Sequence, residues 1–339
     1  MTKITKYLEI ILDGGDLTYE QAKALQDTIF EGEVSDVQIA AFLAAMRMKR
    51  ATAGEIAGLA QSLRDHAVRV ETKFDDLIDT CGTGGAMIKT FNVSTTAALV
   101  AAGAGAHVAK HGNRGITSAC GSADVLSELG VKIDAGPEVV ARCIEEAGIG
   151  FMFAPRYHPA MKFVQPIRKS LDFRTAFNIL GPLANPAGVT GQVLGVADAS
   201  LIERILEALR MLGATRAMVL HGEGMDEISI VGTTKIRWLR GDEITEVEFD
   251  PADFGIRGAS LEQLTGGDVI ANASIVRDIL SGRDTGPRKE IVVVNAAAAI
   301  IVAGLAGDFD SAMALAEKSI AEGAALAALE KLVEVSNKG

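Results

Sequence analysis

The chain has 339 residues, of which 48% are hydrophobic and 5% aromatic, and its 33 Lys and Arg against 44 Asp and Glu give a net charge of −11. This length can bury a large core and hold two domains. An acidic surface repels nucleic acid and anionic lipid, which disfavours polyanion binding as the main role. Any anionic substrate must therefore meet a local group of cations.

Two further features bear on location. The cysteines are three in number and lack Cys-x-x-Cys spacing, which indicates reduced thiols of a cytoplasmic protein. The start of the chain has no secretory signal pattern, and the longest apolar run, 291–305, is shorter than the roughly 20 residues of a membrane helix. We expect no membrane partner.

The first 70 residues predict four short helices. Capping boxes, in which Ser or Thr is followed three residues later by Gln or Glu, begin at Thr18, Ser35 and Thr52. Glycines at 14–15 and 32 end the preceding helices. This pattern predicts a small all-helical N-terminal domain over residues 1–72.

From Asp76 onward, short β-branched runs alternate with Ala- and Leu-rich helical stretches. This alternation predicts a large α/β domain over 73–339, with a mostly parallel central sheet covered by helices. The predicted strands are 77–80, 106–109, 150–153, 193–197, 217–220, 228–231 and 291–294, the last running into a buried helix. Residues 234–249 alternate as a hairpin beside this sheet. Residues 165–190 are rich in Pro and Gly and show neither the helical nor the strand period of apolar residues. We therefore predict a hinge between the domains here, with part of the segment belonging to the helical domain.

The glycine-rich stretch 79–96 resembles a phosphate cradle. A strand leads into Gly82, Gly84 and Gly85, and a helix then opens at Asn92, as expected where backbone N–H groups converge on an anion. The glycines alone match neither the dinucleotide fingerprint nor the P-loop, so an ordinary strand-to-helix turn stays open.

Three other groups each have a functional and a structural interpretation. Asp226-Glu227 after a strand would suit Mg²⁺, or be a solvated acidic turn. Lys110 and Arg114, with Ser118 and Ser122 beyond, would form a phosphate pocket, or an ordinary loop. His158 and Arg168 would recognise a carboxylate, or be a packed histidine and a surface arginine.

Taken together and in order, these motifs resemble the anthranilate phosphoribosyltransferase family along nearly the whole chain. The matching stretches are 82–85, 90–95, 110–114, 121–124, 153–161, 174–186 and 221–227. The resemblance implies a homodimer with the active site between the two domains of each protomer. It also implies transfer of the phosphoribosyl group of 5-phosphoribosyl 1-pyrophosphate (PRPP) to anthranilate, with Mg²⁺, in tryptophan biosynthesis.

By position, the resemblance assigns three sets of residues. The metal would be held by Ser94, Asp226 and Glu227. Anthranilate would contact Gly82, Asn113, His158, Arg168 and Gly181. PRPP would contact Gly82, Gly85, Ala86, Thr90, Asn92, Val93, Ser94, Thr95, Lys110, His111, Gly112, Asn113, Arg114, Ser118 and Ser122. No acid or base is assigned, because an aromatic amine is already a neutral nucleophile at pH 7, and the sequence has no Ser/His/Asp or Cys/His arrangement.

The chain departs from the family pattern at Ala86, where the family has Asp, and in smaller ways at Gly115 and Asp172. The change at Ala86 removes a carboxylate expected near the metal and pyrophosphate. Two alternatives therefore remain beside the transferase: a pyrimidine nucleoside phosphorylase of the same superfamily, and a catalytically impaired relative that binds a phosphosugar or nucleic acid.

Overall fold

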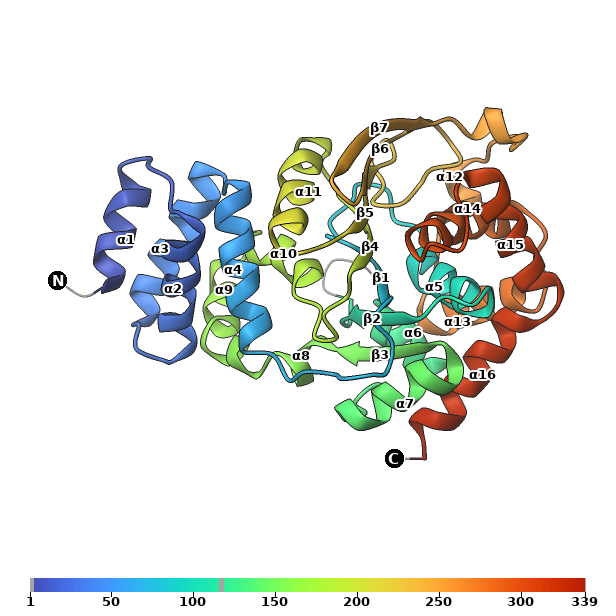
Figure 1. Cartoon of the computed structure of the whole chain (residues 1–339), viewed down its shortest axis with the longest axis horizontal. Coiled ribbons are helices and arrows are strands. Elements are labelled where there is room, and N and C mark those ends of the chain that lie inside the picture. Colours follow the sequence, from blue (N-terminus) through green and yellow to red (C-terminus); the bar gives the residue numbers. More distant parts are fainter. Residues whose placement is uncertain (1–2, 116–118, 339) are drawn as a thin grey trace.

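The computed structural model describes residues 3–115 and 119–338. A helical domain lies beside a larger α/β domain, and the segment containing α8 to α10 runs between them (Figure 1). The predicted fold class, a small helical N-terminal domain with a larger α/β domain around a mostly parallel sheet, is confirmed.

The helical domain begins with the four predicted helices, α1 (Lys3–Leu12), α2 (Tyr19–Phe30), α3 (Asp36–Lys49) and α4 (Ala53–Asp65). All three predicted capping boxes form, because the side chains of Thr18, Ser35 and Thr52 each accept a hydrogen bond from the backbone three residues on. Apolar side chains of the four helices pack into one core that also includes residues of α11 and of strands β4 and β5. The helical domain is thus attached to one face of the sheet.

The α/β domain is built on a seven-stranded sheet in the order β3-β2-β1-β4-β5-β6-β7. The strands are β1 (Ile78–Gly82), β2 (Val108–Gly112), β3 (Ile149–Phe153), β4 (Gly191–Gly195), β5 (Arg216–His221), β6 (Thr234–Arg240) and β7 (Glu243–Phe249). β1 to β5 are parallel, and β6 and β7 form the predicted hairpin, which extends the same sheet through antiparallel pairing with β5. The carboxyl ends of β1 to β5 therefore share one edge, where open parallel sheets bind ligands.

Helices cover both faces of the sheet. On one face α5 and α14 pack together and against α15 and α16, and on the other α11 contacts β5 and α4. The helices of this domain are α5 (Val93–Gly103), α6 (Ser122–Glu128), α7 (Pro137–Ala147), α8 (Ala154–Tyr157), α11 (Ile202–Met211), α12 (Leu261–Leu264), α13 (Val269–Leu280), α14 (Pro287–Val302), α15 (Phe309–Ala321) and α16 (Ala324–Ser336), with short 3-10 turns at Pro159–Phe163, Ala199–Leu201 and Pro251–Phe254.

Two of the predicted strands are wrong. Residues 291–294 lie within α14, whose residues from Ile291 to Val302 are all buried, so burial on every side produced an apolar run without a helical period. Residues 228–231 form a buried loop. Its backbone groups form hydrogen bonds with side chains and not with a neighbouring strand. The N–H of Ile228 donates to the side-chain oxygen of Asn295 in α14, and the side-chain amide of Asn295 donates to the C=O of Ile228.

The segment 165–190, which fits neither sequence period, contains short helices, and its role as a hinge stays a prediction. It forms α9 (Gln165–Leu171), α10 (Phe177–Leu180) and a 3-10 turn at Gly181–Leu183. Ile167, Phe177 and Leu180 are buried in the same core as α2 to α4, so tertiary packing makes short helices despite the prolines. The exact division of the chain at residue 72 stays a prediction.

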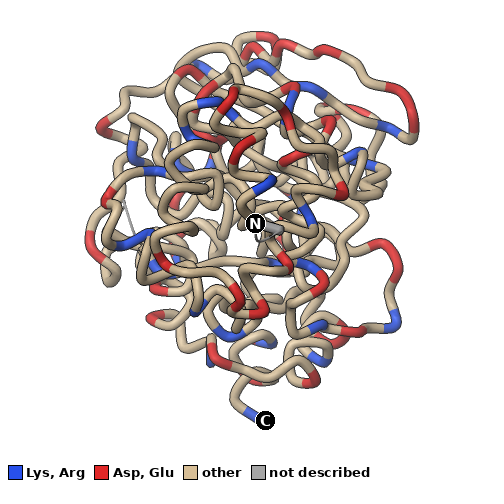
Figure 2. Tube along the Cα trace, turned by 90° about the vertical axis from the view of Figure 1, so that its left-hand side faces the viewer, with Lys and Arg blue, Asp and Glu red and all other residues tan. Residues whose placement is uncertain are grey.

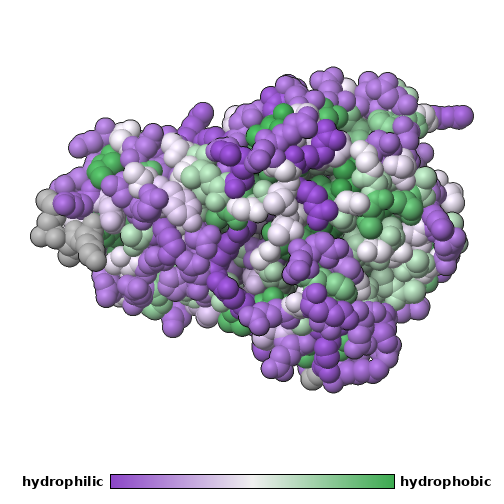
Figure 3. Space-filling model, in the orientation of Figure 1, coloured by the Kyte–Doolittle hydropathy of each residue, from purple (hydrophilic) through white to green (hydrophobic). Residues whose placement is uncertain are grey.

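The surface is polar and of mixed charge. Acidic and basic residues are interspersed along the trace (Figure 2), and on the face shown in Figure 3 hydrophilic residues predominate over the helical domain and along the upper and lower edges of the α/β domain, with apolar residues between those edges. No helix in the described ranges is long and apolar enough to cross a membrane. Cys81 and Cys143 are free thiols, and burial raises the pKa of Cys143 to about 12.

Candidate active site

The glycine-rich loop lies at the carboxyl end of β1, between Gly82 and α5. Gly84 and Gly85 have φ values of 64° and 80°, which only glycine adopts without strain. The backbone N–H of Gly84 donates to Oδ2 of Asp226 at 3.0 Å. A Cβ on Gly82 would lie 2.2 Å from the same oxygen, so this glycine lets the loop and the carboxylate approach each other.

Asp226 and Glu227 lie in the loop that follows β5. Oε1 of Glu227 accepts a hydrogen bond from Thr90 at 3.1 Å, whereas its Oε2 is buried and has no partner among the described residues. Burial, and then the neighbouring Asp226, raise the pKa of Glu227 to about 8, and burial also raises the pKa of Asp226. The acidic pair is therefore not a solvated turn.

The three predicted metal ligands lie around one small cavity. Ser94, Asp226 and Glu227 line a space of about 10 Å³ together with Asn295. A divalent cation would bind the unpartnered oxygen of Glu227 and would stabilise the charged form of both carboxyl groups, which burial disfavours, so these residues fit Mg²⁺. No group of three or more His, Cys, Asp or Glu in the described ranges could hold a metal. Two carboxylates with substrate and water oxygens is a common way of binding Mg²⁺.

Lys110, on β2, is buried against the neighbouring strand β1 and does not lie on an open surface. Its Nζ donates to the backbone oxygen of Thr80 at 2.6 Å, and only 2% of the residue is exposed. Burial lowers its pKa, and burial raises that of the nearby Asp79 to about 6. Asp79 is also held by the side-chain amide of Asn185 at 2.8 Å. This buried pair supports the edge of the sheet at which the loop begins.

The other residues predicted for PRPP lie around the loop or on the β2 side of it. Thr90 bonds Glu227, Asn92 precedes α5 and bonds Asn272 of α13, and Arg114 forms a salt bridge with Asp124 at 2.8 Å. Val93, Thr95 and Ala86 are buried, and a Cβ on Gly112 would lie 2.2 Å from Oγ of Ser122. Ser118 lies outside the described residues. The structure thus gathers residues 82–95, 110–115 and 119–122 at one edge.

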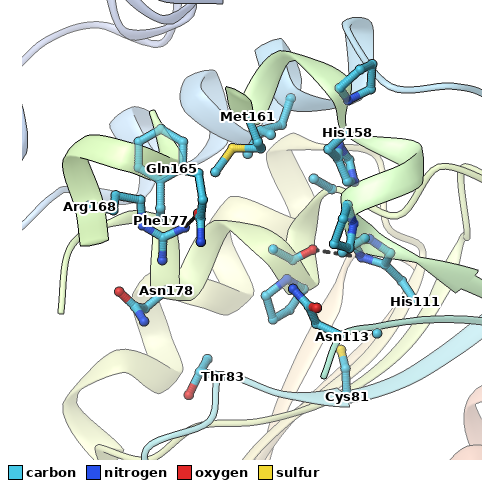
Figure 4. A pocket seen from close by; sticks show the side chains of 18 of the residues that line it. Cys81, Thr83, His111, Asn113, His158, Met161, Gln165, Arg168, Phe177 and Asn178 are labelled. Atoms are coloured by element: carbon cyan, nitrogen blue, oxygen red, sulfur yellow. Dashed lines mark hydrogen bonds between the residues drawn. The ribbon is translucent and has the colours of Figure 1, made fainter. Parts of the chain in front are cut away.

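A separate cavity of about 500 Å³ lies between this edge and α9 (Figure 4). All five residues predicted for anthranilate line it: Gly82, Asn113, His158, Arg168 and Gly181. Figure 4 shows Arg168, Gln165, Phe177 and Asn178 on one side, and His111 and His158 on the other. Because Gly82 and Thr83 form part of its wall, the cavity reaches the phosphate loop.

Arg168 enters the cavity without a carboxylate partner among the described residues. It contacts two neighbours, through a hydrogen bond from Nη1 to Oε1 of Gln165 at 3.3 Å and a cation–π contact with the Phe177 ring at 5.5 Å. Burial lowers its pKa. A largely desolvated guanidinium beside an aromatic ring favours an anionic aromatic ligand.

The two histidines at the other end are neutral. Burial lowers the pKa of His111 to about 3 and that of His158 to about 4. Their rings meet edge to face with centroids 5.0 Å apart, and Nδ1 of His111 lies 3.2 Å from the carbonyl oxygen of Gly181. Neutral imidazoles can bind a polar substrate group without adding charge.

Sequence reasoning missed several residues that the structure brings to the site. Gln165, Phe177 and Asn178 line the cavity from helices that the sequence did not predict. Asn295 was visible only as a polar interruption of an apolar run, and it anchors the residue after the acidic pair. A lone buried amide in an apolar helix is a signal that can be sought in a sequence.

Comparison with known proteins defines the class first. A family model described as the glycosyl transferase family, helical bundle domain, matches residues 5–67, and the model of the a/b domain of that family matches residues 74–326. Both domains of the fold are therefore those of a glycosyl transferase.

Individual relatives narrow the class. Anthranilate phosphoribosyltransferase of Desulfatibacillum aliphaticivorans is 48% identical over 335 residues, which cover 98% of this chain and 99% of the relative. The crystal structure of the enzyme from Thermus thermophilus superposes with a TM-score of 0.93 at 39% identity, over 97% of this chain and 99% of that one. The enzyme from Saccharomyces cerevisiae, in complex with PRPP and Mg, gives a TM-score of 0.90 at 26% identity, over 99% and 98%. This chain belongs to the anthranilate phosphoribosyltransferase family.

Proposed function

We propose that the chain carries out the reaction of its family. It transfers the 5-phosphoribosyl group of PRPP to the amine of anthranilate, with release of pyrophosphate, in L-tryptophan biosynthesis. The observation that carries this proposal is a guanidinium without a carboxylate partner, among the described residues, in a cavity of about 500 Å³ that reaches a phosphate loop.

At the anthranilate end, Arg168 would bind the carboxylate through its planar fork while Phe177 contacts the ring. Asn113, His158 and the backbone around Gly181 would line the path toward Gly82. The amine needs no strong base, because its nitrogen carries a lone pair at pH 7 and both histidines are neutral. Orientation of the amine toward the ribosyl carbon is then the main task of this end.

At the PRPP end, backbone N–H groups of the loop and the first turn of α5 would bind phosphate oxygens. Ser94, Asp226 and Glu227 would hold Mg²⁺, which when bound offsets the negative charge of the leaving pyrophosphate. The buried Lys110 donates to the carbonyl oxygen of Thr80, whose hydroxyl donates to the carbonyl oxygen of Ser94, so it would add positive potential near the proposed metal ligands. The absence of an acidic side chain at Ala86 leaves this pair as the charged metal ligands.

We also propose a homodimer and a cytoplasmic location. An apolar stripe, formed by Val37, Ala41, Ala44 and Met48, runs along α3, where Val37 is 78% exposed and Met48 86% exposed. Burying such a stripe against a second copy removes apolar surface from water. Replacing Met48 by Glu should then give monomers in light scattering. Free thiols at Cys81 and Cys143 support a reducing compartment.

The direct test is incubation with anthranilate, PRPP and Mg²⁺, with loss of anthranilate fluorescence and identification of the product. Omission of PRPP must abolish the signal. A pyrimidine nucleoside with inorganic phosphate tests the phosphorylase alternative, and turnover of that pair without turnover of anthranilate would overturn the proposal. A chain that binds PRPP without turnover would be the impaired relative.

A further inference from the structure

Arg174, between α9 and α10, lies against the phosphate loop. Its Nη2 donates to the backbone oxygen of Gly84 at 2.9 Å and to that of Thr83 at 3.3 Å. A Cβ on Gly85 would lie only 1.5 Å from Nη1, so the guanidinium occupies the space that a side chain there would need. The two successive peptide groups that follow β1 are therefore held by one side chain.

This contact fixes where the amide hydrogens of the loop point. In a trans peptide the C=O and N–H bonds point in opposite directions. Since Arg174 binds the carbonyls of Thr83 and Gly84, the N–H groups of Gly84 and Gly85 are turned away from it. The first donates to Asp226, and the second has no acceptor among the described residues. Successive N–H groups at glycines of positive φ form an anion-binding concavity.

The backbone of Arg174 is in turn held by the helical domain. Arg47, in the last turn of α3, donates to the carbonyl oxygen of Arg174, and its guanidinium lies 5.4 Å from the centroid of the Phe173 ring. No salt bridge occupies Arg174 within the ranges 3–115 and 119–338, so its charge stays available to the loop. A continuous chain of contacts thus joins α3 to the phosphate loop.

We propose that Arg174 is a positioning residue for PRPP: it turns the N–H groups of Gly84 and Gly85 away from its own guanidinium, so that the first binds Asp226 and the second is left to bind the pyrophosphate, and Arg47 holds it in place from the helical domain. The inference rests on the proposed function, because it deepens the role of the loop within that reaction. It predicts that Arg174 acts on PRPP and hardly on anthranilate, although Thr83, to which Arg174 donates, also lines the cavity of about 500 Å³.

The test measures the dissociation constant of PRPP in the presence of Mg²⁺ by calorimetry, together with KM for each substrate. Arg174→Met should weaken PRPP binding by about tenfold to a hundredfold, the range expected when charge-assisted hydrogen bonds are lost. Arg174→Lys, which cannot bridge two carbonyls in the same way, should fall between wild type and Arg174→Met. Arg47→Met should weaken PRPP binding by a few fold, since it removes only the support. Anthranilate KM should change less than twofold in each.

Two controls separate this role from a structural one. Lys169→Met removes an exposed charge from the same segment and should leave the dissociation constant of PRPP unchanged. Added guanidinium should partly restore PRPP binding to Arg174→Ala and have no such effect on Lys169→Met. If Arg174→Met does not fold, the test uses Arg174→Lys and Arg47→Met, both of which should bind PRPP more weakly than wild type does.

Unchanged PRPP affinity in folded Arg174→Met or Arg174→Lys would overturn the inference, as would an equal loss for anthranilate. Those outcomes differ from failure of the proposed function, in which the wild-type chain itself gives no turnover.

Discussion

The end of the site proposed for anthranilate is an open cavity, whereas the end proposed for PRPP and the metal is nearly closed by the protein's own contacts. The anthranilate end is a cavity of about 500 Å³, whereas the cavity among Ser94, Asp226 and Glu227 measures about 10 Å³. At the first end Arg168 has no carboxylate partner among the described residues, and at the second Asp226 accepts a hydrogen bond from the loop itself. A mostly apolar cavity can stay open, but buried polar groups bond one another when they can.

This difference has a consequence for binding. In the proposed binding mode anthranilate needs only to enter its cavity, whereas PRPP with Mg²⁺ must exchange the hydrogen bond between Gly84 and Asp226 for new contacts. The energy of the metal and phosphate contacts is then partly offset by the bonds that are broken. Changes at the PRPP end should therefore affect both turnover and stability, and changes at the anthranilate end mainly substrate use.

The largest effect is expected from Asp226→Asn with Glu227→Gln. The double variant should keep its fold and lose about a thousandfold in turnover or more, since both charged metal ligands are removed. Initial rates from anthranilate fluorescence and circular dichroism measure the two quantities. The matched control is Asp242→Asn with Glu243→Gln, an exposed Asp-Glu pair at the start of β7. Normal activity of the first variant at limiting Mg²⁺ would place the metal elsewhere.

Arg168→Ala should come next. It removes the carboxylate fork from the open end and should raise KM for anthranilate by about tenfold to a hundredfold. PRPP binding, measured by calorimetry, should change little. Lys169→Ala, at the exposed neighbouring position, is the control. An equal weakening of anthranilate use and PRPP binding would show that the two ends are not separate and would contradict the role proposed for Arg168.

The third prediction uses pH to probe the closed end. The pKa of Glu227 is raised from its ordinary 4.5 to about 8, so the folded chain binds more protons than the unfolded chain between these values. Stability therefore falls as pH rises through this window in the absence of a divalent cation. Between pH 7 and 8.5 the two buried histidines, with pKa values of about 3 and about 4, do not contribute.

In EDTA the melting temperature should drop by a few degrees between pH 7 and 8.5, by more than in Glu227→Gln. Mg²⁺ should reduce the drop, because it stabilises the charged carboxylates. Identical pH profiles for wild type and Glu227→Gln would mean that this carboxyl group titrates normally.

The smallest effect is expected from Ala86→Asp. Position 86 is 4% exposed, so a carboxylate there needs a cation nearby. The Mg²⁺ dependence of the initial rate should shift by a few fold, and Ala86→Asn, which has a similar shape without charge, should not reproduce the shift. Superimposable curves for wild type and Ala86→Asp would show that position 86 does not contact the metal and pyrophosphate.

Local signals of the sequence were sufficient for much of the fold. The capping boxes at Thr18, Ser35 and Thr52 form as predicted because Ser or Thr and a residue three positions on interact within one turn. The five parallel strands were predicted correctly because short β-branched runs that alternate with helical stretches are typical of a parallel sheet. The family motifs also placed Gly82, Asn113, His158, Arg168 and Gly181, which line one cavity.

The tertiary structure decided what depends on burial and on partners distant in sequence. The apolar run at 291–294 reads equally as strand or helix, and only packing inside the α/β core makes it part of α14. The composition of residues 228–231 predicts a strand, but in the structure the backbone of Ile228 bonds the side chain of Asn295, which lies 67 positions away. Likewise the sequence marked Arg174 only as part of a motif, whereas its contacts with Thr83 and Gly84 span about 90 residues of chain.

Periodicity and capping act within a few residues, so the sequence by itself determined most of the elements and the motif residues. Side-chain contacts across the fold decided which end of the site is open and which is closed.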